Sequence, residues 1–302
     1  MLQSAISGLS EEIAKTNAKR VLIQLPEGLK RNSTEIIAAI EKSGVEVVYS
    51  IDATYGACDI RLEEARIMKC DAIVHVGHNK FYRDIKSEIP VIYWPWELES
   101  DITGAEFSGI KENVIGIITS IQHKNMMEKV KSRIEESGKT AIIGGQILGC
   151  WSGNAAKIER QVDAFLFVGS GKFHPLGIKS DKPLYTLDLE TRKIEILDTK
   201  IFEKRRYASI FRARDAKSFA ILVSTKEGQS ELLRKAKRIK DYLQKNGKGA
   251  CILVMDEING EKLLGLQVDA YINTACPRIT DGDFSKPMIN ATDVELLFEE
   301  VL

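Results

Sequence analysis

The five cysteines are the residues of this chain best suited to chemistry. They stand far apart, at Cys58, Cys70, Cys150, Cys251 and Cys276. No CxxC pair and no CxxxCxxC loop is present, so neither a zinc ribbon nor the usual radical-enzyme cysteine loop is encoded. In a reducing compartment such thiols are buried, metal-bound or catalytic. A metal site must therefore be assembled by folding, from distant loops.

Three copies of one unit supply those loops. A short apolar run introduced by Asp-Ala recurs at residues 70–76, 162–168 and 268–274 and is typical of a buried strand. An amphipathic helix precedes each run, over 33–43, 125–137 and 229–246, and ends at a glycine suited to a left-handed C-cap, namely Gly44, Gly138 and Gly247. A strand precedes each helix (20–25, 114–119 and 219–224), and another follows it (45–49, 140–143 and 250–255).

Strands that alternate with helices indicate parallel sheets of right-handed crossover units. We therefore expect an α/β protein of three small parallel-sheet domains, over 1–105, 106–210 and 211–302. The linkers are expected at 104–108 and 203–215. The alternative is one continuous sheet with coincidental Asp-Ala dipeptides.

Three cysteines fall at related places in the repeat. Cys58 and Cys150 each stand 13 residues before the aspartate of their Asp-Ala run, just beyond the second strand. Cys276 stands 7 residues after the third aspartate, where the first two units have His78 and Ser170. Loops at the carboxyl ends of parallel strands are where open α/β sheets place their ligands. The pattern predicts that the three cysteines converge on one site.

Three thiolates can hold a cubane iron–sulfur cluster and leave one iron open to a substrate, which would make the protein a redox enzyme. Small neighbours such as Gly56 and Gly149 let backbone amides approach the sulfurs. Two alternatives stay open: three unrelated buried thiols, or a tetrahedral zinc site completed by a histidine such as His78. Cys70 and Cys251 are most simply core residues.

Composition and charge exclude other classes of protein. The 302 residues include 43 basic and 43 acidic side chains, a balance that argues against a protein that grips nucleic acid through its phosphates. No apolar run approaches the roughly 20 residues that span a bilayer. The N-terminus lacks a basic segment followed by an apolar one. We therefore expect a cytoplasmic protein.

The residues around the cysteines resemble a known family, the archaeal diphthamide-biosynthesis enzyme 2-(3-amino-3-carboxypropyl)histidine synthase. The matching segments are LPEGLK at 25–30, DATYGACD at 52–59, HVGH at 75–78, QILGC at 146–150, FVGSGKFHPLG at 167–177 and NTACPR at 273–278. They occur in family order, so the resemblance covers nearly the whole chain.

The resemblance implies a homodimer whose three domains lie in pseudo-threefold arrangement around a [4Fe–4S] cluster held by Cys58, Cys150 and Cys276. It also implies S-adenosylmethionine as co-substrate, an electron donor, and a histidine of translation elongation factor 2 as acceptor. In this family the reduced cluster cleaves the bond from sulfur to Cγ of the methionine moiety. The 3-amino-3-carboxypropyl group then adds to C2 of the imidazole, the first step of diphthamide biosynthesis.

Two rival functions remain. One is a quinolinate synthase-like [4Fe–4S] dehydratase, in which the open iron acts as a Lewis acid. The other is a noncatalytic, metal-stapled partner subunit.

The loop 167–177 is expected to form a wall of the S-adenosylmethionine pocket. Its glycines, Gly169 and Gly171, let backbone amides approach a ligand, and its polar residues, Ser170, Lys172 and His174, bring charge or hydrogen-bond donors. The plainer interpretation is an ordinary turn, because glycine-rich turns after strands are common.

The remaining candidate contacts lie in other loops of the same edge. Glu27 and Lys30 could contact the amino and carboxylate groups of the co-substrate; the alternative is a helix-entry turn capped at 32–33. Arg278 is either a carboxylate clamp or an ordinary surface pair. Tyr55, beside the first cluster cysteine, completes the set.

Three further features have weaker interpretations. His75 is predicted to be a satisfied core histidine, His78 a hydrogen-bond donor more than a metal ligand, and His123 a residue facing the shared edge. The basic run 200–214 is expected to be a solvated linker, and docking to an acidic patch of the protein substrate is its alternative.

Overall fold

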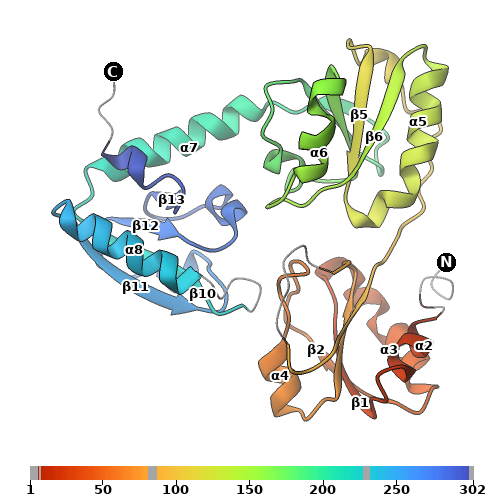
Figure 1. Ribbon diagram of the computed structural model, residues 1–302, viewed down its shortest axis with the longest axis horizontal. Helices are drawn as coiled ribbons and strands as arrows, with labels where there is room; N and C mark the ends of the chain where they lie inside the picture. The colour runs from red at the N-terminus through yellow and green to blue at the C-terminus, as the bar shows by residue number, and fades with distance from the viewer. Residues whose placement is uncertain (1–5, 7, 81–86, 227–231, 299–302) are drawn as a thin grey trace. The chain divides into compact units, whose positions relative to one another are not determined.

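The structure is a computed structural model that describes residues 6, 8–80, 87–226 and 232–298. It divides into two compact units, Met1–Ile196 and Leu197–Leu302. The first unit holds two sheets and the second holds one (Figure 1). The alternative prediction of one continuous sheet is therefore wrong. The predicted α/β class, with three sheets of mostly parallel strands, is confirmed.

All three sheets share one strand order, with the first strand of each repeat lying between the second and third. The first sheet has the order β2-β1-β3-β4, from β1 (Arg20–Gln24), β2 (Glu46–Ser50), β3 (Ala72–Val76) and β4 (Val91–Trp94). The second has the order β6-β5-β7-β8-β9, from β5 (Val114–Thr119), β6 (Thr140–Gln146), β7 (Ala164–Val168), β8 (Leu184–Leu187) and β9 (Ile194–Ile196). The third has the order β11-β10-β12-β13, from β10 (Ser218–Ser224), β11 (Gly249–Met255), β12 (Ala270–Asn273) and β13 (Met288–Asn290). Every pairing is parallel except β8 with β9.

The helices lie where the repeat predicts them. The α-helices are α2 (Leu9–Ala14), α3 (Ser33–Glu41), α4 (Leu62–Ile67), α5 (Met127–Glu136), α6 (Gly153–Ile158), α7 (Thr199–Arg214) and α8 (Leu232–Lys245). The 3-10 helices are η1 (Glu27–Asn32), η2 (Phe107–Gly109), η3 (Ile121–Met126), η4 (Glu159–Gln161), η5 (Pro175–Gly177), η7 (Glu261–Leu263), η8 (Pro277–Asp281) and η9 (Glu295–Leu297). Gly44, Gly138 and Gly247 have φ of 82°, 83° and 73°, which confirms the left-handed caps. The start predicted for the third helix, at 229, lies outside the described residues. No helix in the described ranges is long and apolar enough to cross a membrane.

The repeated aspartate fastens two neighbouring strands together. Asp71 Oδ2 accepts the backbone N–H groups of Lys19 and Arg20, at 2.8 and 2.9 Å. The equivalent contacts are Val114 N to Asp163, and Lys217 N and Ser218 N to Asp269, each at 2.9 Å. These hydrogen bonds tie the start of the Asp-Ala strand to the start of the central strand. The recurrence of the aspartate in the sequence therefore has a structural cause.

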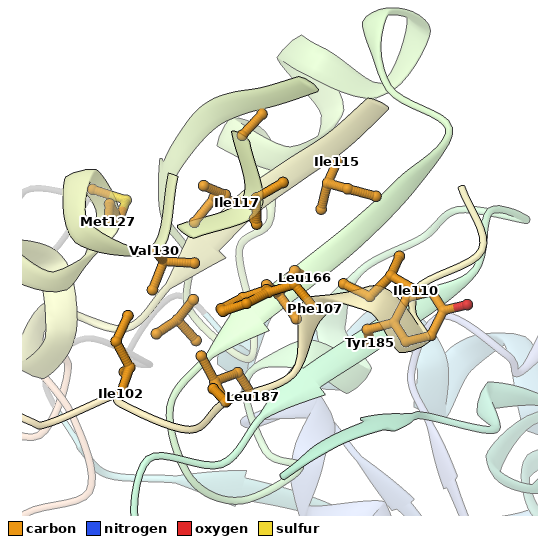
Figure 2. Close-up of a cluster of buried hydrophobic side chains, with 14 of the residues drawn as sticks. Ile102, Phe107, Ile110, Ile115, Ile117, Met127, Val130, Leu166, Tyr185 and Leu187 are labelled. Atoms are coloured by element: carbon orange, nitrogen blue, oxygen red, sulfur yellow. The ribbon is translucent and has the colours of Figure 1, made fainter. Parts of the chain in front are cut away.

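The second sheet shows how alternation along a strand builds two covered faces. Ile115 and Ile117 of β5 point to the face covered by α5, where Val130 and Leu166 complete a buried cluster (Figure 2). Gly116 points to the opposite face, where a Cβ atom would lie 2.9 Å from the side chain of Ile158 in α6. Both faces are apolar because helices cover both.

Both predicted linkers contain buried residues. Ala105 and Phe107 are each 3% exposed and pack into the core of the second sheet. Residues 200–214 lie in the helix α7, and most of them are exposed, as predicted for a solvated segment. The Asp198 side chain accepts the Lys200 N–H at the start of α7, and Ile210 is buried in the core of the third sheet. The boundary predicted at 210 falls within this helix, and the three domain ranges stay predictions.

Candidate metal centre

Cys150 lies at the corner of a tight turn beyond the carboxyl end of β6. Leu148 N donates to Trp151 O at 2.8 Å, and Trp151 N donates back to Leu148 O at 3.1 Å. This reciprocal pair places Gly149 and Cys150 at the two corner positions. The Cys150 side chain is exposed, which keeps its sulfur accessible to a ligand.

Cys58 lies in the loop that follows β2. The Asp59 N–H donates to Gly56 O at 2.9 Å and turns the chain around the cysteine. Gln24, buried in β1, donates to Asp59 O at 2.6 Å and so anchors the loop to the sheet. The Tyr93 hydroxyl donates to Ala57 O, beside this cysteine, at 3.4 Å. Burial, and secondarily the charge of the Cys58 thiolate, raises the pKa of Tyr93 to about 12.

Cys276 is the N-cap residue of η8 and stands three residues after the last residue of β12. The buried side chain of Asn273 donates to Cys276 O at 2.8 Å and accepts from Ala275 N at 2.9 Å. Pro277 follows at the first position of η8, where a proline costs no hydrogen bond. The loop conformation is thus set by the last residue of the strand.

All three cysteines lie in loops at the carboxyl edges of their sheets, as predicted from the repeat. Cys58 and Cys150 belong to the first unit and Cys276 to the second. Within the described ranges, no group of three or more His, Cys, Asp or Glu side chains is arranged to hold a metal ion. The Nδ1 atom of His78 is hydrogen-bonded to His75. This nitrogen is therefore not available as the fourth ligand of the alternative zinc site. The donor set is three thiols on turns of small residues, and this set suits an iron–sulfur cluster.

The loop 167–177 packs directly on the Cys150 turn. A Cβ atom on Gly149 would lie 2.6 Å from the ring of Phe173, and one on Gly177 would lie 2.5 Å from Gly149 O. Gly169 and Gly171 have φ of 142° and 81°, so glycine is needed at both. The predicted wall of the co-substrate pocket is therefore adjacent to one of the proposed cluster ligands.

The other predicted contacts are engaged with neighbours. Lys30 Nζ lies 2.5 Å from Glu27 Oε1, and Arg278 forms an ion pair with Asp281 inside η8. Burial raises the pKa of Asp281, and the Arg278 charge opposes that rise. Tyr55 is 60% exposed. Ser170 and Lys172 are also exposed.

The predicted helix cap at 32–33 does not form. Asn32 makes no side-chain hydrogen bond to the start of α3. The reason is that η1 runs directly into α3, and Lys30 O accepts the Ser33 N–H instead.

The two remaining cysteines differ. Cys70 is 7% exposed and lies in the core, as predicted. Cys251 is exposed, so the core prediction for it is wrong. Its strand, β11, pairs only with β10 and is the edge of its sheet, so its outward side chains meet solvent.

All four histidines of the chain belong to the first unit, at the carboxyl edges of its two sheets. His75 is fully buried, and its Nε2 lies 2.9 Å from His78 Nδ1. Burial, and then the charge of the neighbouring His174, lowers the pKa of His78 to about 4; burial lowers the pKa of His174 to about 4 as well. His75 is a core histidine as predicted, but within the described residues its Nδ1 has no partner. The hydrogen bond between His75 and His78 was not predicted, although two histidines three residues apart at the end of a strand could have indicated it.

Three sheets of mostly parallel strands, each with one of these cysteines in a loop at its carboxyl edge, define a repeated-domain α/β protein. The model of the family described as "Putative diphthamide synthesis protein" matches residues 25–301. The chain therefore belongs to the diphthamide synthesis protein family, as its resemblance to that family predicted.

Individual relatives agree over nearly the whole chain. The 2-(3-amino-3-carboxypropyl)histidine synthase of Pyrococcus horikoshii is 35% identical, over 98% of this chain and 93% of that protein. Subunit 1 of the synthase from Schizosaccharomyces pombe is 30% identical, over 94% of this chain and 71% of that protein. The crystal structure of Dph2 from Pyrococcus horikoshii with a 4Fe-4S cluster has a TM-score of 0.86 at 35% identity, over 96% of this chain and 89% of that one. The chain is therefore similar to enzymes of this class in sequence and in fold.

Proposed function

We propose that this chain transfers the 3-amino-3-carboxypropyl group from S-adenosylmethionine to C2 of a histidine of translation elongation factor 2. This is the first step of diphthamide biosynthesis. The observation that carries the proposal is the placement of Cys58, Cys150 and Cys276 in loops at the carboxyl edges of the three sheets. Membership of a family with a cluster-containing relative supports it.

The three cysteines are proposed to hold a [4Fe–4S] cluster at the centre of a pseudo-threefold arrangement of three domains. Once bound and reduced, the cluster supplies the one-electron cleavage of the bond from sulfur to Cγ. The protein must orient that bond and exclude water from it. Cysteines in loops beyond the strand ends suit this role because they can reach a shared ligand without unfolding a strand.

The chain's own residues are proposed to orient the co-substrate. The loop 167–177 is fixed against the Cys150 turn by the Gly149 and Gly177 contacts, so a ligand on this loop lies beside the sulfur. Backbone amides of Gly169 and Gly171 face the ligand, and Ser170, Lys172 and His174 contribute donors. Glu27, Lys30, Tyr55 and Arg278 complete the proposed binding set. The charged members must exchange their present partners for the ligand.

The proposed partners are the elongation factor and an electron donor, and the proposed assembly is a cytoplasmic homodimer. Light scattering of the purified holoenzyme tests the assembly: a mass of two chains supports it, and a mass of one chain contradicts it.

Neither rival function is favoured by an observation in the structure. The family match favours the transferase over the dehydratase.

Anaerobic reconstitution tests the proposal. The protein should bind about four iron and four sulfide per chain and turn brown. It should release methylthioadenosine from S-adenosylmethionine after reduction with dithionite and should alkylate the elongation factor. Cys58→Ala and Cys150→Ala should each abolish both products, whereas the matched control Cys251→Ala should retain them. A colourless protein that releases no methylthioadenosine, or a fully active Cys58→Ala variant, would overturn it.

A further inference from the structure

His78 and Cys276 occupy the same position of the repeat. Each stands 7 residues after the aspartate that introduces its third strand. Three residues earlier, at the end of that strand, stand His75 in the first sheet and Asn273 in the third. Asn273 donates from its side chain to Cys276 O at 2.8 Å, and His75 Nε2 lies 2.9 Å from His78 Nδ1. In both sheets the strand residue positions the loop residue.

The contact between the two imidazoles determines where their protons lie. Only one proton can occupy the line between His75 Nε2 and His78 Nδ1. If His78 donated it, the proton of neutral His75 would sit on Nδ1, which is buried and has no partner within the described part of the chain. A buried unpaired N–H is rarer and costlier than an unpaired acceptor. His75 therefore donates from Nε2, and His78 carries its own proton on Nε2.

The surroundings of His78 keep the group neutral. Among the residues that the structure describes, the titratable groups near it are His75 and His174, and beyond His75 the ring of Tyr93, at 5.3 Å from the His75 ring. His174 belongs to the loop 167–177 and packs on Phe173 with ring centroids 5.1 Å apart. A neutral donor here adds no positive charge to repel a sulfonium ion.

We propose that His78 is a substrate-binding residue that donates its Nε2–H to the carboxylate of S-adenosylmethionine, with His75 as the residue that positions it. The inference rests on the proposed function. The carboxylate is the one anionic group of this co-substrate, and a hydrogen bond to a charged acceptor is the strongest that a neutral imidazole can make. The donor stands at the repeat position that in the third sheet carries a proposed cluster ligand.

The tautomer can be observed without the cluster. The chain has only four histidines, so the ¹⁵N imidazole spectrum of iron-free protein is simple, and single His→Gln variants assign it. We expect His78 to be protonated at Nε2 and bare at Nδ1 at neutral pH. The opposite tautomer, or a doubly protonated ring, would overturn the inference.

Binding of the co-substrate tests the contact itself. Equilibrium dialysis of the anaerobic holoenzyme should show that His78→Leu weakens binding of S-adenosylmethionine by about 10- to 100-fold. His78→Gln keeps a donor at a similar place and should remain within about 5-fold of the parent. His75→Phe should weaken binding through loss of orientation. Iron content and thermal unfolding of each variant show whether it is folded and loaded.

The decarboxylated co-substrate distinguishes this contact from a general disturbance of the pocket. The parent protein should bind it more weakly than S-adenosylmethionine, and His78→Leu should cause no further loss. An equal loss for both ligands would contradict the assignment to the carboxylate. If the parent binds no S-adenosylmethionine, the proposed function fails. If the parent and His78→Leu bind it equally, only the role of His78 fails.

Discussion

The carboxyl edges of the first and third sheets share one local arrangement, for which we propose two different roles. In each of these sheets the last or next-to-last residue of the third strand is a buried polar residue, His75 or Asn273, that contacts a residue three places on. That second residue is His78 in the first sheet and Cys276 in the third. In the second sheet the same places hold Phe167 and Ser170, and the cysteine stands on the neighbouring turn. The repeat thus preserves the position while the side chain there changes its role.

Substitution of the equivalent residues Cys276 and His78 should give the largest contrast. Cys276→Ala removes a proposed ligand, so we expect loss of the cluster iron and at least about a 100-fold drop in methylthioadenosine release. His78→Leu should retain its iron and lose co-substrate affinity. Iron analysis of the two variants, purified side by side, makes the comparison. Loss of iron from both would mean that the two positions share one role.

The histidines should also make the stability of the chain depend on pH. Burial lowers the pKa values of His75, His78, His123 and His174 below the ordinary value of 6.5. Above pH 6.5 both the folded and unfolded chains are neutral at these sites. As pH falls from 6.5 toward 4, these histidines bind protons in the unfolded chain but not in the folded chain. The free energy of unfolding therefore decreases.

At pH 5.5, His78 and His174 should each destabilise the folded state by about 1.4 kcal/mol at most. Thermal unfolding of iron-free protein should therefore show a midpoint lower than at pH 7.5, by about 5–10 °C. His174→Gln removes one titrating group and should reduce the shift. A midpoint that rises on acidification would refute the burial of neutral imidazoles. The third sheet has no histidine and should contribute nothing to this shift.

Asn273→Ala should destabilise the third sheet's edge by about 1–3 kcal/mol, because buried hydrogen-bonding groups lose their partner. The side chain bonds Cys276 O, Ala275 N and the Asn290 side chain. Urea unfolding measures the loss. Asn273→Asp keeps the acceptor for Ala275 and removes the donor to Cys276, so it should release iron faster than the parent. Unchanged iron retention in both variants would show that Asn273 does not position the cysteine.

The parts of the fold that the sequence predicts are those with a local cause. The C-cap glycines and the Asp-Ala runs mark the helices and central strands because left-handed φ and strand alternation are local requirements. The fourth strands, such as β4 and β13, are four and three residues long and lie at the sheet edge, so alternation gives them little signal. A proline precedes each of β4, β8 and β13 (Pro90, Pro183 and Pro287), and this recurrence could have revealed them.

The errors arose where a contact from elsewhere in the chain decides the outcome. The basic run of α7 is mostly exposed, as predicted, but its helical form was not predicted, and Arg206 makes two hydrogen bonds to the buried carboxylate of Asp293, at 2.9 and 2.7 Å. The exposure of Cys251 depends on which strand lies at the sheet edge. For the site, the offsets of Cys58, Cys150 and Cys276 were readable from the repeat. The hydrogen bond between His75 and His78 could be predicted only once the end of β3 was known.

The smallest expected effects concern the aspartates that start each third strand. Asp269 accepts the N–H groups of Lys217 and Ser218 and the Ser218 hydroxyl, whereas Asp71 accepts two backbone N–H groups. The Ser218 hydroxyl, then these backbone groups, lowers the pKa of Asp269, and the Arg20 and Lys19 N–H groups lower that of Asp71.

Substitution by alanine should therefore lower the thermal midpoint more at Asp269 than at Asp71. Asp163, with one such N–H contact in the described structure, should lose least. Calorimetry of the three single variants at pH 7 gives the order. If Asp163→Ala proved the most damaging, the aspartate would matter through something other than its bonds to the central strand. The first and third sheets would then share the aspartate in sequence without sharing its contribution to stability.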